Sequence, residues 1–425
     1  MGTAASEVLS GLSLSNRLQK LPLSQEMPSP RLWYRDSPMA TIGISTRGAK
    51  RIRQGHLWVF RSDLRHASDA SAGAIVEVVD EANNFVGQAF YSDRSEIALR
   101  FLSTRKEKID RQWWRARLRA CADRRGSLSR ETNAYRLVYS EGDLLPSIIV
   151  DVYDGHYVLQ TLSQGSDCVK SELIELLIEE FKPRSIIELN EARVRQIEGL
   201  ESRRAVVYGE HSPEIDILQH GLHFIVSPAI GQKTGAFLDQ RENYRAAQPV
   251  AHGRGLDCFT FNGGFALHLA PVCDSVLGID ISVDAVTAAK RNARLNDLGN
   301  VRFEVANVFD ALRGMESAGE RFDTIVLDPP AFTKSRATIK SGTRGYKEIN
   351  LRALKLMNTG GILITCTCSY HISEQMFLEI IAGASADARR RVQIIEKRGQ
   401  ANDHPVLLGV PETHYLKCVI ARAVD

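Results

Sequence analysis

The sequence predicts an α/β protein whose C-terminal half forms a mostly parallel β-sheet. From about residue 255, short apolar runs alternate with segments of helical spacing, which is typical of parallel strands joined by helical crossovers. Two stretches of different character precede this half, one rich in short β segments and one of mixed strands and helices. The predicted strands are residues 256–261, 276–280, 301–305, 324–328 and 362–366, and the predicted helices are residues 265–272, 283–295, 346–357 and 373–382.

The N-terminal quarter of the chain is predicted to hold a leader and a small domain. Residues 1–40 mix Ser, Pro and Leu without periodicity, so we expect a loosely ordered leader. Residues 41–110 should form a small all-β domain, because segments 74–79, 85–91 and 97–102 are rich in β-forming residues and separated by turn residues. A domain of this size is too short for an enzyme site of its own.

The middle of the chain is predicted to be an α+β domain at residues 111–210. A helix is expected at residues 111–125, and Asp154-Gly155 is a hairpin signal between two strand-like segments. Residues 171–181 have helical spacing and precede a further strand. Residues 211–425 then contain the parallel sheet.

Composition indicates an ordinary cytoplasmic protein. Of the 425 residues, 44% are hydrophobic and 25% are charged, as in globular proteins. No apolar run approaches the roughly 20 residues that cross a bilayer. The seven cysteines are an odd number without a CxxC pair, which predicts neither a disulfide framework nor a zinc site. We therefore expect a cytoplasmic location, no membrane contact and no metal.

Positive charge is concentrated near the N-terminus. Residues 41–130 contain 18 Lys and Arg against 10 Asp and Glu, an excess of 8, although the whole chain carries only +3. Residues 111–119 interleave tryptophans with arginines. Two interpretations are equally open, a solvated helix anchored by Trp113 and Trp114 or a surface that faces RNA.

The chemistry of a parallel sheet is expected at the carboxyl ends of its strands. The first such end, Asp257-Cys-Phe-Thr-Phe-Asn-Gly-Gly-Phe265, has glycines that let a ligand approach the backbone, but it lacks the GxGxxG of dinucleotide sites. The second end is Asp280, which can accept hydrogen bonds from the ribose hydroxyls of a nucleoside. Its distance of 17 residues from Gly263 suits one intervening helix, which favours a ligand contact over a surface helix cap.

Two further strand ends carry reactive or polar groups. Asp328 is followed by two prolines, which stiffen the loop and hold its carboxylate outward. Cys368 lies just past the next strand, beside the Asp-Pro-Pro loop. Cysteine is among the most buried residue types, and Cys366 fits that description better than Cys368 does.

These four motifs in this order resemble the class I S-adenosylmethionine (SAM) methyltransferases. More narrowly, the chain from about Thr41 onward resembles the bacterial ribosomal RNA large subunit methyltransferase I family. The matching segments are Gly55-His-Leu-Trp-Val-Phe60, Tyr135-Arg-Leu with Glu141-Gly-Asp-Leu-Leu-Pro146, Gly231-Gln-Lys-Thr-Gly-Ala-Phe-Leu-Asp-Gln-Arg241, Asp403-His-Pro, and Pro411-Glu with Tyr415-Leu-Lys417.

The resemblance implies an N-terminal PUA-like domain, a middle α+β domain and a Rossmann-like methyltransferase domain with a mostly parallel seven-stranded sheet. It implies SAM as cofactor and ribosomal RNA, in particular 23S, as partner, and it leaves a homodimer open. One departure is Asn307, where relatives commonly carry Asp near the adenine. The residues expected to hold SAM are Gln240, Arg241, Phe259, Asn262, Gly263, Gly264, Asp280, Asn307 and Asp328.

The implied reaction is methylation of carbon 5 of a cytosine. This carbon is a poor nucleophile, so a cysteine thiolate first adds to carbon 6 and activates the base. Cys368 is the expected nucleophile, Asp328 would hold the base edge near nitrogen 3, and Glu412 would accept the carbon-5 proton. The expected base contacts are Pro329, Pro330 and Phe332.

Rival functions remain. The Asp-Pro-Pro-Ala-Phe loop also resembles loops that stack a flipped base on their aromatic ring, which would suit methylation of guanine or of an exocyclic amine through Phe332. Ala331 stands where cytosine enzymes with two cysteines carry one of them. The choice of carbon-5 methylation over these rival reactions therefore depends on Cys368. A non-catalytic RNA-binding assembly factor is a second alternative. A small-molecule or protein methyltransferase would not need the basic β-rich module.

Overall fold

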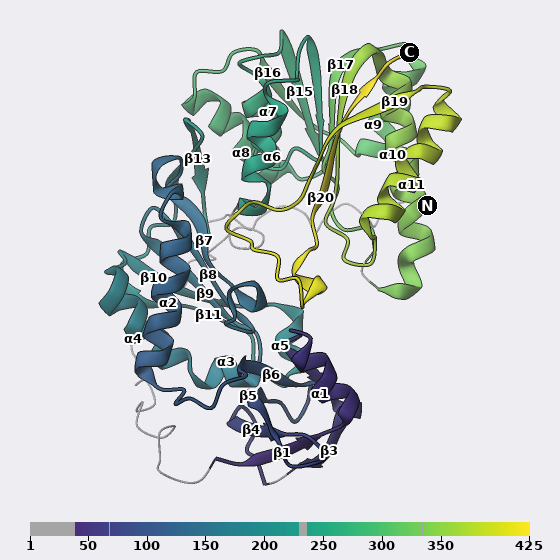
Figure 1. Cartoon of the computed structure of the whole chain (residues 1–425). Helices are drawn as coiled ribbons and strands as arrows, with labels where there is room; N and C mark the ends of the chain where they lie inside the picture. Colours follow the sequence, from purple (N-terminus) through teal and green to yellow (C-terminus); the bar gives the residue numbers. More distant parts are fainter. Residues whose placement is uncertain (1–38, 68, 229–235, 334) are drawn as a thin grey trace, which may run out of the picture. The chain divides into compact units, whose positions relative to one another are not determined.

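The structure is a computed structural model that describes residues 39–67, 69–228, 236–333 and 335–425. The predicted leader therefore lies outside the described residues, apart from its last two. Within the described ranges the strands form three larger sheets and one two-stranded hairpin (Figure 1). None of the helices in these ranges is long and apolar enough to cross a membrane.

The first sheet has six strands in the order β2-β6-β5-β4-β1-β3. The predicted all-β domain is wrong in one respect, because helix α1 follows β1. Ser45 caps this helix by accepting a hydrogen bond from the Gly48 N–H, and its last turn carries Lys50, Arg51 and Arg53. The elements are β1 (Thr41–Ile44), α1 (Thr46–Arg53), β2 (Trp58–Phe60), β3 (Leu64–Ala67), β4 (Ile75–Val79), β5 (Phe85–Tyr91) and β6 (Ile97–Ser103).

The second sheet has five strands in the order β11-β10-β9-β8-β7. Strands β8 and β9 pair as an antiparallel hairpin across Asp154-Gly155, as the sequence predicts. The elements are α2 (Arg111–Arg125), β7 (Ala134–Tyr139), β8 (Ile148–Tyr153), β9 (His156–Thr161), α3 (Gln164–Cys168), α4 (Lys170–Phe181), β10 (Ser185–Asn190), α5 (Arg193–Ile197) and β11 (Arg203–Gly209).

Helix α2 is an anchored structural helix. Trp113 and Trp114 are buried in the core, with 8% and 0% of their surfaces exposed. The arginines along the helix pair with glutamates of α4: Arg111 with Glu172, Glu175 and Glu179, Arg115 with Glu179 and Glu180, and Arg119 with Glu180. The structure thus favours the solvated, anchored helix over the RNA-facing surface, because the charge of α2 is largely matched within the protein.

The third sheet has seven strands in the order β16-β15-β14-β17-β18-β20-β19. Strands β14 to β18 are parallel, β20 runs antiparallel to β18, and β19 is antiparallel to β20. This is the predicted mostly parallel sheet. Its elements are α6 (Arg241–Ala247), β14 (Arg254–Cys258), α7 (Gly264–Leu269), β15 (Ser275–Asp280), α8 (Val283–Leu295), β16 (Val301–Val305), α9 (Val308–Ser317), β17 (Phe322–Leu327), α10 (Ile339–Leu356), β18 (Met357–Thr367), α11 (Glu374–Ala388), β19 (Val392–Arg398) and β20 (Lys417–Ala423).

Helices cover both faces of this sheet, with α6, α7 and α8 on one side and α9, α10 and α11 on the other (Figure 1). The hairpin β12 (Ile215–Gln219) and β13 (Leu222–Val226) is fixed to α8, because Asn292 and Asn296 accept from the N–H groups of Ile225 and His223 at 2.9 and 2.8 Å. The strand order reverses at β14, which has β15 on one side and β17 on the other. Ligands of open α/β sheets bind at such a reversal.

Candidate active site

The loop that follows β14 is strained. Phe259, Phe261 and Gly263 have φ angles of 66°, 51° and 92°. A bulky residue with positive φ costs about 1–3 kcal/mol and persists only where neighbouring contacts hold it. The Phe261 N–H donates to Asp280 Oδ2 at 3.0 Å, and the Ser282 N–H donates to Oδ1 at 2.9 Å. The carboxylate at the end of β15 therefore holds the loop, and the strain makes the loop a candidate for ligand binding.

Asp257, the last-but-one residue of β14, is a site residue that the sequence argument missed. Its Oδ2 accepts from the Thr260 hydroxyl at 2.6 Å and from the Ala266 N–H at 2.9 Å, whereas the buried Oδ1 has no hydrogen-bond partner among the described residues. Burial raises the pKa of Asp257 to about 7, and Asp280 contributes to the rise. A buried carboxylate oxygen without a partner is suited to a cationic ligand group. The available signal was an acidic residue inside an apolar strand.

The raised pKa predicts an unusual pH dependence of stability. Between about pH 4 and 7 the folded protein keeps a proton on Asp257 that the unfolded chain has released, so stability from this group falls as pH rises through that range. Asp257→Asn should therefore raise the free energy of unfolding of the ligand-free protein by about 2–4 kcal/mol at pH 8, with the gain vanishing toward pH 4.

Denaturant unfolding at pH 5, 7 and 8.5 measures this difference. The exposed Asp310 provides the control, because Asp310→Asn removes a carboxylate at the surface and should leave the pH profile unchanged. A parallel offset of the Asp257→Asn and wild-type profiles at every pH would refute the assignment.

Tyr244 fills the space next to the second glycine of the loop. A Cβ at position 264 would lie 2.6 Å from the Tyr244 hydroxyl, so a glycine is required here by packing against the protein. The prediction that this glycine lets a ligand approach the backbone is therefore wrong for Gly264. Burial raises the pKa of Tyr244 well above its usual value, and Asp328, Asp239 and Asp257 add to the rise. The negative charges of these three carboxylates act on the same region, where they would favour a cation.

The Asp-Pro-Pro loop after β17 is tied to the loop after β18. The Thr333 N–H donates to Ser369 Oγ at 3.2 Å, and the Tyr346 and Ser369 hydroxyls are 2.8 Å apart. Asp328 and Phe332 are half-buried, and the Phe332 ring packs 4.7 Å from the Tyr346 ring. Of the two prolines, Pro329 is buried and Pro330 is exposed. Ser369 is a second residue that the sequence argument missed.

The two cysteines after β17 differ in environment. Cys366 is fully buried and pairs in register with Cys418 of β20, and burial raises the pKa of its thiol well above the usual value. Cys368 is half-buried and lies one residue beyond the end of β18. The structure therefore places the half-buried Cys368 thiol at the carboxyl edge of the sheet and the Cys366 thiol in the core.

Gln240 and Arg241 lie at the start of α6, and their side chains are held by the protein. Gln240 Oε1 accepts from Asn243 Nδ2 at 2.7 Å. The fully buried Arg241 pairs with Asp403 at 3.0 Å and with Glu242 at 2.9 Å. These contacts favour a structural role for Arg241 over the predicted contact with the cofactor. Residues 231–235 of the same predicted segment lie outside the described residues.

Three other predicted residues have definite partners. The Asn262 carbonyl accepts from Asn292 Nδ2 at 3.0 Å. Asn307 caps α9, with its Oδ1 accepting from the Phe309 N–H at 2.9 Å, so the acceptor expected to meet an adenine amino group already has a backbone donor. Glu412 Oε2 lies 3.3 Å from His56 Nε2 of the N-terminal module.

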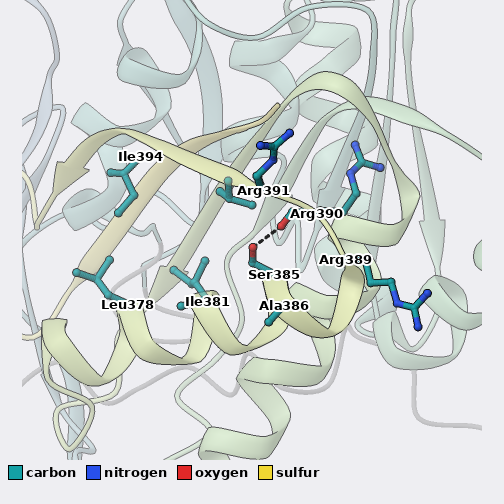
Figure 2. A pocket seen from close by; sticks show the side chains of 10 residues that line it. Leu378, Ile381, Ser385, Ala386, Arg389, Arg390, Arg391 and Ile394 are labelled. Atoms are coloured by element: carbon teal, nitrogen blue, oxygen red, sulfur yellow. Dashed lines mark hydrogen bonds between the residues drawn. The ribbon is translucent and has the colours of Figure 1, made fainter. Parts of the chain in front are cut away.

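A further cavity is lined by other residues. A cavity of about 410 Å³ lies between α11 and β19, and apolar side chains and arginines line it (Figure 2). None of the predicted site residues lines it. Among the described residues there is no cluster of three or more His, Cys, Asp or Glu side chains that could hold a metal.

Comparison with known proteins gives the class. The family described as S-adenosylmethionine-dependent methyltransferase matches residues 197–409, and the family described as PUA-like domain matches residues 42–104. A solved methyltransferase complexed with SAH is 18% identical with a TM-score of 0.80, and a SAM-dependent methyltransferase from Streptococcus mutans is 18% identical with a TM-score of 0.78. Each covers 91% of this chain and 100% of its own. The fold is that of a SAM-dependent methyltransferase, and the family match covers half of the chain.

Curated relatives narrow the class to one family. Ribosomal RNA large subunit methyltransferase I of Tolumonas auensis is 39% identical over 90% of this chain and 99% of its own length. The proteins of the same name from Erwinia tasmaniensis and Klebsiella pneumoniae are 36% and 35% identical, over 88% and 92% of this chain and 97% and 100% of their own lengths. The chain belongs to the ribosomal RNA large subunit methyltransferase I family, and its cofactor is SAM.

Proposed function

We propose that this protein methylates carbon 5 of a cytosine in 23S ribosomal RNA, with Cys368 as covalent nucleophile. The relatives' names specify large-subunit ribosomal RNA, which supports the RNA substrate. The single observation that carries the choice of carbon 5 is the half-buried Cys368, held next to the Asp-Pro-Pro loop by the Ser369 hydroxyl.

SAM would lie across the ends of β14 and β15. The unpartnered Oδ1 of Asp257 and the carboxylate of Asp328 suit the positive charges of its ammonium and sulfonium groups. Asp280, which holds the strained loop, would accept from the ribose hydroxyls. Ile281 follows it with 69% of its surface exposed, an apolar side chain suited to one face of the adenine. Bound SAM supplies an electrophilic methyl group.

The protein's own groups would carry the remaining steps. The Cys368 thiolate would add to carbon 6, and the displaced π electrons of the base would form the bond from carbon 5 to the methyl group while the bond from that methyl group to the sulfonium sulfur breaks and S-adenosylhomocysteine leaves. Asp328 holds the base edge near nitrogen 3 during this addition. Glu412 then takes the proton from carbon 5, and the electron pair left behind restores the double bond as the bond from sulfur to carbon 6 breaks and returns the thiolate.

The place of Glu412 is compatible with this role. Besides burial, its negative charge helps to raise the pKa of Tyr370, two residues beyond Cys368, and its Oε2 lies 3.3 Å from His56 Nε2. The same contacts connect the N-terminal module with the loop of the proposed nucleophile.

The N-terminal PUA-like module is the proposed RNA-binding part. Helix α1 presents the side chains of Arg47 and Arg53 with 67% and 55% of their surfaces exposed, and Lys50 is exposed between them. Exposed cations along one helix suit phosphate contacts. Arg47 and Arg53 pair with Asp63 and Asp80 but remain more exposed than Arg111 and Arg115 of α2, which are 31% and 29% exposed in their pairs with α4. We therefore assign the RNA contact to α1 and its sheet.

The rival function through Phe332 has less support. Stacking of a flipped base needs a free ring face, whereas the Phe332 ring packs near the rings of Phe259, Phe309 and Tyr346. Methylation of guanine or of an exocyclic amine would also leave the thiol of Cys368 without a chemical role.

Nucleoside mass spectrometry tests the proposal. Ribosomal RNA from a strain lacking this protein should lack one 5-methylcytidine, and incubation of that RNA with purified protein and SAM should restore it. Restoration of a methylguanosine or methyladenosine instead would support the rival function, methylation of another base position. Restoration of no methylated nucleoside in either subunit RNA would favour a non-catalytic assembly factor.

A further inference from the structure

Lys417 is a buried cation at the start of β20. Only 5% of its surface is exposed, and it pairs in register with Thr367 at the end of β18. Its Nζ donates to the carbonyl oxygens of Tyr415 at 3.1 Å and of Ser369 at 3.4 Å. Since Ser369 directly follows Cys368, the ammonium group lies beside the loop that carries the thiol.

No carboxylate neutralises this ammonium group at ion-pair distance within the described ranges. Burial lowers the pKa of Lys417, and the charges of Cys368 and Glu374 oppose that shift. Glu374 is itself paired with Lys397 at 2.6 Å. Cys368 is therefore a group whose negative charge would favour the ammonium form of Lys417.

The two tyrosines near this pair do not compete with the thiol as anions. Tyr346 on α10 and Tyr370 in the cysteine loop both have a raised pKa, chiefly because of burial, so both are neutral near pH 7. Glu412 contacts Tyr370 and faces His56. Like Glu374, it would disfavour a thiolate, so a nearby cation is needed to offset it.

We infer that Lys417 is a positioning residue that keeps Cys368 in its thiolate form. Electrostatic coupling is reciprocal, so an anion that favours the ammonium is favoured by it to the same extent. The thiol proton goes to water, Lys417 stays protonated, and the pair is neutral together. The inference deepens the proposed function and rests on it for its purpose, but the acidity of the thiol can be measured without RNA or methyl transfer.

The test is the pH profile of Cys368 alkylation by iodoacetamide, followed by mass spectrometry of the Cys368 peptide. In the wild-type protein the apparent thiol pKa should lie below the usual value of about 8.5. In Lys417→Met it should rise by about one unit or more, and Lys417→Arg should retain the low value. Cys168 serves as an internal reference, because burial raises its pKa to about 11.

A matched control is Lys355→Met, which removes a lysine at the end of α10 that pairs with Glu316 and should leave the Cys368 profile unchanged. A wild-type thiol pKa at or above about 8.5 overturns the inference without any variant, and so does equal alkylation of wild type and Lys417→Met at every pH. If the profile shifts as expected but no protein–RNA adduct forms, the inference about Lys417 stands and the proposed nucleophile fails.

Discussion

Cys368→Ala is expected to reduce methyl transfer by about three orders of magnitude or more while leaving the affinity for SAM unchanged. The loss is large because carbon 5 of cytosine cannot attack the methyl group until a nucleophile has added to carbon 6. SAM affinity should persist, because the proposed SAM contacts come from the loop after β14 and from Asp280, not from the loop after β18. Single-turnover methylation assays and calorimetry with SAM measure the two effects.

RNA that carries 5-fluorocytidine at the target position tests the role of Cys368 directly, because it should trap a covalent protein–RNA adduct. Fluorine cannot leave as a proton does, so elimination is blocked and the wild-type protein should remain attached to the RNA through Cys368. In Glu412→Gln, an adduct with ordinary cytidine should accumulate, because proton removal precedes elimination. The matched control is Cys366→Ser, a change in the neighbouring buried thiol that should lower stability but preserve the adduct. An adduct through Cys366 would correct the residue.

The parallel sheet was predictable because its signals are local. Helix α8 begins and ends at the predicted residues, since Ser282 caps it and its apolar spacing continues to Leu295. Helix α10 begins at Ile339, seven residues before the predicted start. Its first two turns contain Gly342 and Gly345, poor helix formers that are needed because the loop residues Thr333 and Phe332 press against them.

Elements that depend on distant partners could not be predicted. Strand β19 alternates weakly and is largely exposed, and it is a strand because it pairs with β20 at the sheet edge. The arginines of α2 were ambiguous because their glutamate partners are about sixty residues away in the chain. Helix α9 was not predicted for a different reason: its capping residue, Asn307, was interpreted only as a ligand contact.

The residues of the candidate site also differ in whether they could be predicted from the sequence. Asp280, Asp328 and Cys368 follow from topology, because the carboxyl ends of parallel strands meet at one edge. Asp257 and Lys417 emerge only from burial, since a missing hydrogen-bond partner or an unneutralised charge is a property of the packed structure. The sequence offers only a weak signal for Asp257, an acidic residue inside an apolar strand.

Asp403 is the centre of a buried polar cluster that joins the C-terminal tail to the other elements. It is fully buried, and its Oδ2 accepts from Arg241 at 3.0 Å and from the Arg136 N–H of β7 at 2.9 Å. Its backbone carbonyl accepts from Arg125 of α2 at 2.7 Å. Burial alone would raise the pKa of Asp403, but His404 and Arg241 overcome it and hold that pKa well below the usual value.

Asp403→Ala should lower the free energy of unfolding by about 3–5 kcal/mol, because it leaves the guanidinium of Arg241 buried without its main partner. Denaturant unfolding at pH 7 measures the loss. Asp403→Ala combined with Arg241→Met should cost less than Asp403→Ala alone, because no unpaired charge then remains in the core. Asp310→Ala, which removes an exposed ion pair, should change stability by less than about 0.5 kcal/mol.

Since the lowered pKa stabilises the folded state only while Asp403 is ionised, the difference between wild type and Asp403→Ala should shrink as pH falls below about 4. A single and a double variant of equal stability would show that the charge of Arg241 is not the cause of the loss.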